Sequence, residues 1–414
     1  MATSNIAGSQ IVVENLLQKE VIRLKDKKTV IKQAANTKYQ GELRKQGDVV
    51  TVQQVPNMFG NIGGTAGDDI TAQAWTIADY NLTVDQVYQD NRKIKGIEQI
   101  QSNLELRGQI ANRIAFGSAL NEDQFVASLT TQADSNNKLN NQSPATLSAS
   151  NTYSNITSLK RVLSEQNAFE SGMLFVSPAI HEKMRLENIL GSSDVGLNLR
   201  LNGVVGRLDG FQVMETNNLA HVRSLTIDTI GTATDTFTVT GRTAQSTSGT
   251  GGFTNTSVVW TLVANGAASS AGEISIGTSA AETQANIVLA INGTGTPGAS
   301  TYIDVSAANR TAMKNAMLKI SDFSSDVATL QSAIYAPVAE TFTAGTNVFG
   351  VDAELMFAVD REAINFVSQM DQFKVTDAQL GFYNSLLHEK AYGGAVLGDN
   401  AKGLATNEIV TGNA

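Results

Sequence analysis

The residues best suited to chemistry in this sequence are few and scattered. The 414 residues include three histidines and no cysteine. His181, His221 and His388 lie in three different contexts, and none stands two or four positions from another. A zinc site needs several Cys or His ligands held together, so one is hard to assemble here. We predict neither a metal site nor a cofactor.

Nucleophilic catalysis is equally poorly supported. The Gly-x-Ser-x-Gly motif, which exposes a serine on a tight turn, does not occur. His181 closely follows Pro178 at a predicted helix start, where capping or surface exposure is expected rather than acid–base work. Acid pairs such as Asp68–Asp69 occur in any chain of this length. We predict no catalytic residues, and therefore no enzyme.

Binding of phosphate or nucleic acid also lacks a recognisable motif. The glycine-rich stretch 60–67 has no Gly-Lys-Ser/Thr and is better interpreted as a flexible hairpin tip. Trp75 and Trp260 are isolated, and a single aromatic residue on a β surface is usually a packing anchor. The net charge of −9 argues against a surface that grips DNA broadly.

Basic residues gather at the N-terminus, although the chain as a whole is acidic. Residues 1–47 carry nine Lys and Arg against four Asp and Glu. The apolar residues that recur there at helical spacing are Leu17, Val21, Leu24, Ile31 and Ala35. The pattern predicts a basic amphipathic helix over 14–36. It would lie on its own domain as a solvated helix, or pack on a neighbouring subunit or an acidic partner.

Targeting signals are not evident in the sequence. No basic run is followed by an apolar core at the N-terminus, and no segment approaches ~18 consecutive apolar residues. The sequence therefore predicts neither an export signal nor a membrane span. The absence of cysteine fits assembly in a reducing cytoplasm.

A long hairpin is predicted after the basic arm. The runs 47–56 and 71–88 are rich in strand-forming residues, and a glycine-rich tip separates them. Two-stranded hairpins of this kind are marginal in water. This one needs another surface on which to lie.

An α/β unit follows the hairpin. Helical patterns cover 96–130 and about 154–167, and the run 173–176 predicts a buried strand. Ser177 and Pro178 then supply an N-cap and a first-turn proline for another helix.

The composition changes after His221. Residues 223–348 are rich in Thr, Ser, Gly and Ala and predict an inserted, mostly β domain with one helix near 282–291. The α/β pattern then returns with a strand over 355–359, a helix through Ala363 and Val367, and strands with glycine-flanked turns up to the end.

The order of these parts resembles a known family. Its most specific motif is Gly-x-Leu-x-Gly-Phe-x-Val followed by Asn-Asn-Leu, and the strand AYGGAVL comes near the C-terminus. The motif residues are Gly206, Leu208, Gly210, Phe211, Val213 and Asn217. The chain thus resembles major capsid proteins of tailed bacteriophages, whose HK-ninety-seven-like coat fold is shared with encapsulins. The resemblance covers about 10–222 and 349–412.

This resemblance implies an α+β fold with named parts. Residues 1–47 would be the N-arm, 48–95 the E-loop and 96–152 the peripheral (P) domain with its spine helix. The axial (A) domain would comprise 153–222 and 349–362, and the P domain would finish with 363–414. The A domain would carry 223–348 as an outward-facing insertion.

The resemblance also implies a function and partners. Copies of the chain would form the hexamers and pentamers of an icosahedral shell around double-stranded DNA, without sequence-specific binding and without a membrane. A separate scaffolding protein, a portal and possibly a decoration protein would be partners. Assembly in the host bacterial cytoplasm would place the protein in the virion.

Contacts between subunits are expected from the arm and the E-loop. The candidate residues are Arg23, Lys27, Met58, Phe59, Trp75, Arg92 and Lys93. Lys93 and Lys95 lie near the E-loop base, so the covalent Lys–Asn crosslink of some family members is not expected. The rival interpretations are an encapsulin-like cellular compartment, a host-binding virion surface protein and an unrecognised hydrolase.

Overall fold

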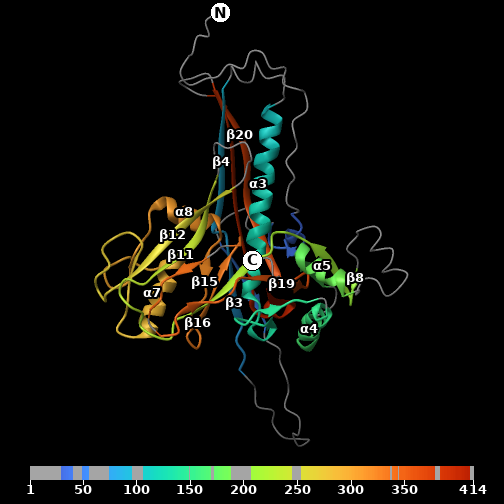
Figure 1. The fold of residues 1–414 in the computed structure, drawn as a ribbon. Coiled ribbons are helices and arrows are strands. Elements are labelled where there is room, and N and C mark those ends of the chain that lie inside the picture. The colour runs from blue at the N-terminus through green and yellow to red at the C-terminus, as the bar shows by residue number, and fades with distance from the viewer. Residues whose placement is uncertain are drawn as a thin grey trace, which may run out of the picture.

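The computed structural model combines one elongated region with two lobes (Figure 1). It describes residues 29–40, 49–55, 74–95, 106–148, 150–168, 172–187, 207–244, 253–335, 338–343, 345–377 and 383–410. Within these ranges, helix α3 and strands β4 and β20 run together along the elongated region. One lobe contains α4, α5 and β8, and the other contains α7, α8, β11 and β12 (Figure 1).

A large sheet of eleven strands links the two lobes. Its main path is β15 (Lys319–Ile320), β16 (Val327–Ser332), β10 (His221–Thr226), β19 (Ala353–Val359), β7 (Met173–Val176), β9 (Phe211–Glu215) and β8 (Arg207–Leu208). Strand β22 (Leu404–Val410) also pairs with β19, while β18 (Val348–Phe349) pairs with β10, and β5 (Lys138–Leu139) and β6 (Ala145–Thr146) pair with β22. The parallel pairing of β7 with β9 places the glycine-containing motif beside the buried centre of the molecule.

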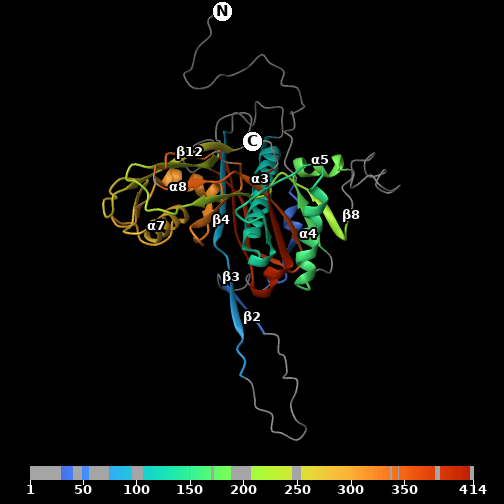
Figure 2. The ribbon, with the colours of Figure 1, turned by 60° about the horizontal axis from the view of Figure 1, so that its bottom comes forward.

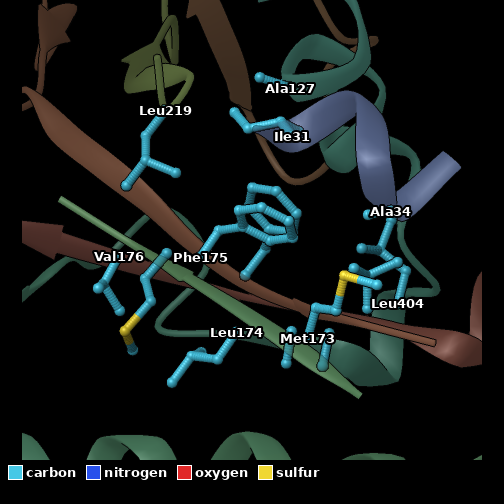
Figure 3. Close-up of a cluster of buried hydrophobic side chains, with 14 of the residues drawn as sticks. Ile31, Ala34, Ala127, Met173, Leu174, Phe175, Val176, Leu219 and Leu404 are labelled. Carbon is cyan, nitrogen blue, oxygen red and sulfur yellow. The ribbon is translucent and has the colours of Figure 1, made fainter. Parts of the chain in front are cut away.

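The predicted helix–strand–helix unit is present around β7. It comprises α4 (Thr152–Glu165), β7 and α5 (Pro178–Leu186), and all four residues of β7 are buried. The Ser177 hydroxyl accepts a hydrogen bond from the Ile180 amide at 3.3 Å, which confirms the expected N-cap. Figure 3 shows the packed side chains around Phe175, whose ring stacks on that of Phe357 with centroids 4.7 Å apart.

A second, four-stranded sheet lies along helix α3 (Leu106–Leu129). Its order is β1 (Ala35–Asn36), β20 (Ile364–Asp377), β21 (Tyr383–Val396) and β4 (Gln86–Lys95). Phe125 of α3 packs edge-on against Tyr392 and Phe366, at centroid distances of 5.2 and 6.5 Å. These aromatic contacts hold the long helix against the sheet.

The helix predicted through Ala363 and Val367 is wrong. A turn ends at Ala363, and strand β20 begins at Ile364. Phe366 faces α3, whereas Val367 packs in a separate cluster with Leu82. A strand covered on both faces has a continuous apolar sequence, which periodicity alone does not distinguish from a helix.

The C-terminal segment 363–414 is divided between the two sheets. Strands β20 and β21 belong to the four-stranded sheet, whereas β22 pairs antiparallel with β19 in the large one. The segment joins the two sheets covalently.

The predicted helix over 14–36 is corrected at its end. Ile31–Ala34 forms a short 3₁₀ helix, η1, and Ala35–Asn36 forms β1, parallel to β20. Ile31 and Ala34 are both buried, as expected for a 3₁₀ turn in which positions i and i+3 coincide. Residues 14–28 lie outside the described ranges.

The hairpin after the arm is present at its base. Strands β2 (Val49–Gln54) and β3 (Ala78–Thr83) pair antiparallel over six residues each. They extend away from the other strands (Figure 2). The chain then leaves the hairpin, and β4 joins the four-stranded sheet instead.

The segment predicted to be an insertion contains a helix that was not expected. A five-stranded sheet has the order β14 (Tyr302–Ile303), β13 (Glu273–Ser275), β12 (Phe253–Val263), β11 (Thr236–Ala244) and β17 (Ala339–Glu340). Helix α7 (Ala280–Asn292) was expected, and α8 (Ala307–Asn315) was not. Only Ala312 and Met313 of α8 are buried, so its apolar signal is short.

The predicted boundary at 223 falls inside strand β10. This strand pairs with β16 from the insertion on one side and with β19 on the other. We therefore use the term inserted lobe for residues 227–347. Its packing is continuous with the large sheet rather than separated by a linker.

Candidate assembly surfaces

The hairpin presents large apolar side chains to solvent. Val49, Val55, Trp75 and Ile77 have exposed fractions between 42% and 59%. Large apolar side chains exposed along an extended element offer apolar surface for contact with another chain. Trp75 was a predicted contact residue, and its exposure agrees with that prediction without testing it.

The end of the hairpin at Leu82 and Thr83, which we call its root, packs against β20 and β21. Leu82 is fully buried in a small cluster with Val367 and Leu397. A Cβ atom added at Gly393 of β21 would lie only 1.9 Å from the carbonyl oxygen of Thr83. Glycine at 393 therefore permits the hairpin backbone to cross β21 at a distance that any other residue would block.

The remaining predicted contact residues divide into two groups. Arg92 pairs with Asp90 at 2.8 Å, and the Lys93 ammonium lies 5.1 Å from the centroid of the Tyr383 ring. Both side chains are thus engaged on the four-stranded sheet of their own chain. Those outside the described residues are Arg23, Lys27, Met58 and Phe59.

The glycine-containing motif forms a tight hairpin within the large sheet. Asp209 and Gly210 have φ angles of 52° and 90°, as a two-residue turn between β8 and β9 requires. Phe211 and Val213 are buried, and Leu208 packs against the same core. The last motif residue, Asn217, is exposed, and Gly206 lies outside the described residues.

Each of the three histidines lies beside a carboxylate from another part of the chain. His181 Nδ1 is 2.5 Å from Glu215, His221 Nδ1 is 2.9 Å from Asp352, and His388 Nε2 is 2.9 Å from Asp371. His181 is buried, and Ser177 rather than His181 caps its helix, so the expected capping or exposure is wrong. The pairs lie in three separate places and join neighbouring elements.

A run of four polar residues in α3 is the main feature that sequence reasoning missed. Asn121, Glu122, Asp123 and Gln124 lie in the middle of the helix, and the last three are almost fully buried. Asn121 donates a hydrogen bond to the Tyr392 hydroxyl at 2.5 Å. We call residues 121–124 the polar centre of α3.

Asp123 joins the N-terminal segment to the end of the motif. Its Oδ1 accepts hydrogen bonds from the amides of Ile31 and Lys32, at 2.7 and 3.1 Å. Its Oδ2 accepts one from the Asn218 side chain at 2.8 Å. Burial raises the pKa of Asp123, and these hydrogen bonds oppose that rise.

Glu122 lies between two lysines from opposite ends of the chain. Its carboxylate is 2.6 Å from Lys32 and 2.6 Å from Lys390. Lys390 also pairs with Asp371 at 2.9 Å. Burial alone would lower the pKa of Lys390, but its hydrogen bonds with Glu122 and Asp371 raise it overall. The polar centre therefore connects the N-terminal segment, the motif and β21.

A buried acid in the last strand has an altered pKa. Glu408 of β22 accepts a hydrogen bond from the Gln142 amide at 2.8 Å. Burial raises the pKa of Glu408 to about 7, although that hydrogen bond and the nearby Lys138 oppose the shift. This carboxyl group titrates in the neutral range.

The part of the chain that the structure describes has no cluster of three or more His, Asp or Glu side chains suited to a metal ion. None of the described helices combines the length and hydrophobicity that crossing a membrane requires.

Comparison with known proteins gave matches in structure alone. No family model and no curated relative matches the sequence. A structure from Mycobacterium phage Che8 matches with a TM-score of 0.56 and 14% identity, covering 100% of both chains. The capsid structure of cyanophage P-SCSP1u matches with a TM-score of 0.54 and 12% identity, over 96% of this chain and 93% of the other.

The cyanophage Pam1 capsid matches with a TM-score of 0.50 and 10% identity, covering 100% of both chains. The fold is that of phage capsid proteins. The resemblance inferred from the motif is thus confirmed at the level of the fold, which is a mixed α+β arrangement.

Proposed function

We propose that the protein is the major capsid protein of a tailed, double-stranded DNA bacteriophage. The observation that supports this proposal is the similarity of the fold to phage capsid structures, combined with the exposed apolar side chains on and next to the hairpin. In this function β2 and β3 are the base of the E-loop. The exposed residues Val55 and Trp75 become buried when the hairpin lies over a neighbouring copy.

The other parts take the roles that the resemblance implies. Helix α3 with the four-stranded sheet serves in the P domain as its spine helix and long sheet, and residues 153–222 and 349–362, with α4 and α5, serve as the A domain. Repeated contacts between copies close hexamers and pentamers, and these close an icosahedral shell. Many weak contacts in one shell give a stable container.

The proposed partners follow from the same function. A scaffolding protein directs assembly in the host cytoplasm, a portal occupies one vertex, and the inserted lobe offers a position for a decoration protein. The net charge of −9 suits a container for DNA, because a strongly cationic wall would hold the genome by its phosphates. The DNA is enclosed without sequence-specific binding.

Deletion of one hairpin tip tests this function. Removal of residues 58–69 takes away the end of the E-loop and leaves the paired strands β2 and β3 in place. We expect a folded subunit that no longer forms shells when expressed with its scaffolding protein. Negative-stain electron microscopy scores the shells, and circular dichroism scores the folding.

The chain offers a matched control for that deletion. Residues 245–252 connect β11 and β12, so their shortening alters another hairpin of the same chain. We expect shells from this variant. Normal shells from the 58–69 deletion would overturn the proposal, and co-purification of the intact protein with a cargo enzyme would favour an encapsulin.

A further inference from the structure

The inserted lobe contacts α3 through two long polar side chains. Arg242 of β11 donates a hydrogen bond to the Gln124 side chain at 2.6 Å. Gln331 of β16 donates one to the carbonyl oxygen of Ser128 at 2.9 Å and accepts one from the Thr131 hydroxyl at 2.6 Å. The lobe therefore holds the helix at its polar centre and again at its C-terminal end.

Arg242 is buried in an unusual environment for a cation. Its side chain donates to the carbonyl oxygen of Asn315, and its guanidinium lies 4.0 Å from the centroid of the Phe253 ring. None of the ion pairs found among the described residues includes it, and burial is the largest influence on its pKa. Burial lowers the pKa of Arg242 to about 10. A buried charge that loses a hydrogen bond is costly, so the contact with Gln124 matters energetically.

The neighbouring residues of α3 hold the N-terminal segment. Asp123 binds the amides of Ile31 and Lys32, and Glu122 binds the Lys32 ammonium. Successive residues of a helix are rotated by about 100°, so Gln124 faces a different side of α3 from Asp123. A shift of this turn would disturb both sets of contacts together.

We propose that the inserted lobe and the N-terminal segment 29–36 are energetically coupled through the polar centre of α3. The two states involved are the segment docked on Asp123 and the segment released from it. A partner that binds the lobe and shifts Arg242 changes the docking of this segment, and release of the segment changes the lobe by the same factor. This coupling does not depend on the proposed capsid function.

Hydrogen exchange in the full-length protein tests the coupling. In R242M the side chain keeps most of its bulk and loses its hydrogen bonds to Gln124 and Asn315. We expect the amides of Ile31 and Lys32 to exchange roughly tenfold faster, within the usual range of coupling between sites. The amides of β12 should remain protected, which shows that the lobe is still folded.

Arg310 of the same lobe provides the matched control. It pairs with Asp304 and donates to the carbonyl oxygens of Ala290 and Ile291 at the end of α7, all within the lobe. We expect R310M to leave the exchange of Ile31 and Lys32 unchanged while β12 remains protected. Equal acceleration in R310M and R242M would overturn the proposal, because it would show a general loss of stability.

Two further variants keep the proposal falsifiable. If R242M does not fold, Q124A removes the same contact from the helix side, and the same tenfold acceleration is expected. In the reverse direction, D123N should accelerate exchange of the β11 amides in the lobe. Unchanged exchange at Ile31 and Lys32 in a folded R242M or Q124A protein would overturn the coupling.

Discussion

The two tryptophans of this chain lie in regions of opposite character. Trp260 is fully buried in the inserted lobe, where its ring meets Tyr302 edge-on at 6.5 Å. Trp75 lies beside the hairpin, with 56% of its surface exposed. The lobe has a core of its own, whereas the described part of the hairpin meets the rest of the chain through a small cluster at Leu82 and a hydrogen bond from the Asp399 amide to the Gln54 side chain. The difference separates residues that stabilise one subunit from residues available to join two.

The largest expected effect concerns the lobe. Trp260→Ala removes a fully buried side chain and leaves a cavity, which should lower the free energy of unfolding by about 3–5 kcal/mol. Chemical denaturation of the subunit, followed by circular dichroism, measures the loss. A change below about 1 kcal/mol would show that the lobe core tolerates the cavity and would weaken the contrast with the hairpin.

A smaller effect concerns the pH dependence of the free energy of unfolding, to which Glu408 in the large sheet and Glu273 in the lobe should contribute with opposite signs. The pKa of Glu408 is raised from 4.5 to about 7, so its favourable contribution is present at acidic pH and is lost as the pH rises through 7. We expect stability to fall by about 2 kcal/mol between pH 5 and pH 8 from this group. Glu408→Gln should abolish that part of the decline in denaturation curves.

The lobe should respond to pH in the opposite direction. Hydrogen bonds from the backbone amides of Ser269 and Ser270 lower the pKa of Glu273, so this contribution is lost as the pH falls through the lowered value. Glu273→Gln is therefore the control for Glu408→Gln. An unchanged pH profile in Glu408→Gln would contradict the assignment of the neutral-range titration to this residue.

The smallest effect on the subunit is expected at Trp75. Because this side chain is mostly exposed, Trp75→Ser should change the free energy of unfolding by no more than about 0.5 kcal/mol. Shell formation should nevertheless decline, since the exposed ring would be buried only between copies. Native light scattering of assembly reactions measures this effect. A stability loss as large as that of Trp260→Ala would erase the distinction between the two regions.

Several elements of the fold could be predicted from short stretches of sequence. Ser177 and Pro178 marked the start of α5, the apolar run 173–176 marked a central strand, and the motif glycine Gly210 lies at the turn between β8 and β9. In each case the residue type acts on its own stretch of backbone, through a cap, a buried strand or a positive φ angle. Such signals do not depend on which distant segment lies nearby.

Features that depend on distant partners could not be predicted. The residue types in the polar centre of α3 are common in helices. They link α3 to other segments only because of distant partners, which are Lys32, Asn218, Arg242 and Lys390. The sole signal was a run of four consecutive polar residues within the long helical pattern. The helix predicted through Val367 was wrong for a related reason. Val367 is buried by residues of the hairpin root, which are distant in the sequence.

The polar centre of α3 also limits how the helix can move. Residues 121–124 sweep through about 300° around the helix axis, and together they are tied to β21, the N-terminal segment, the motif and the inserted lobe. Rotation about the long axis would break all four attachments at once, whereas bending above or below them would spare most. While the N-terminal segment stays docked, these contacts oppose rotation of α3, so a change of subunit shape that keeps them requires the helix to bend above or below residues 121–124.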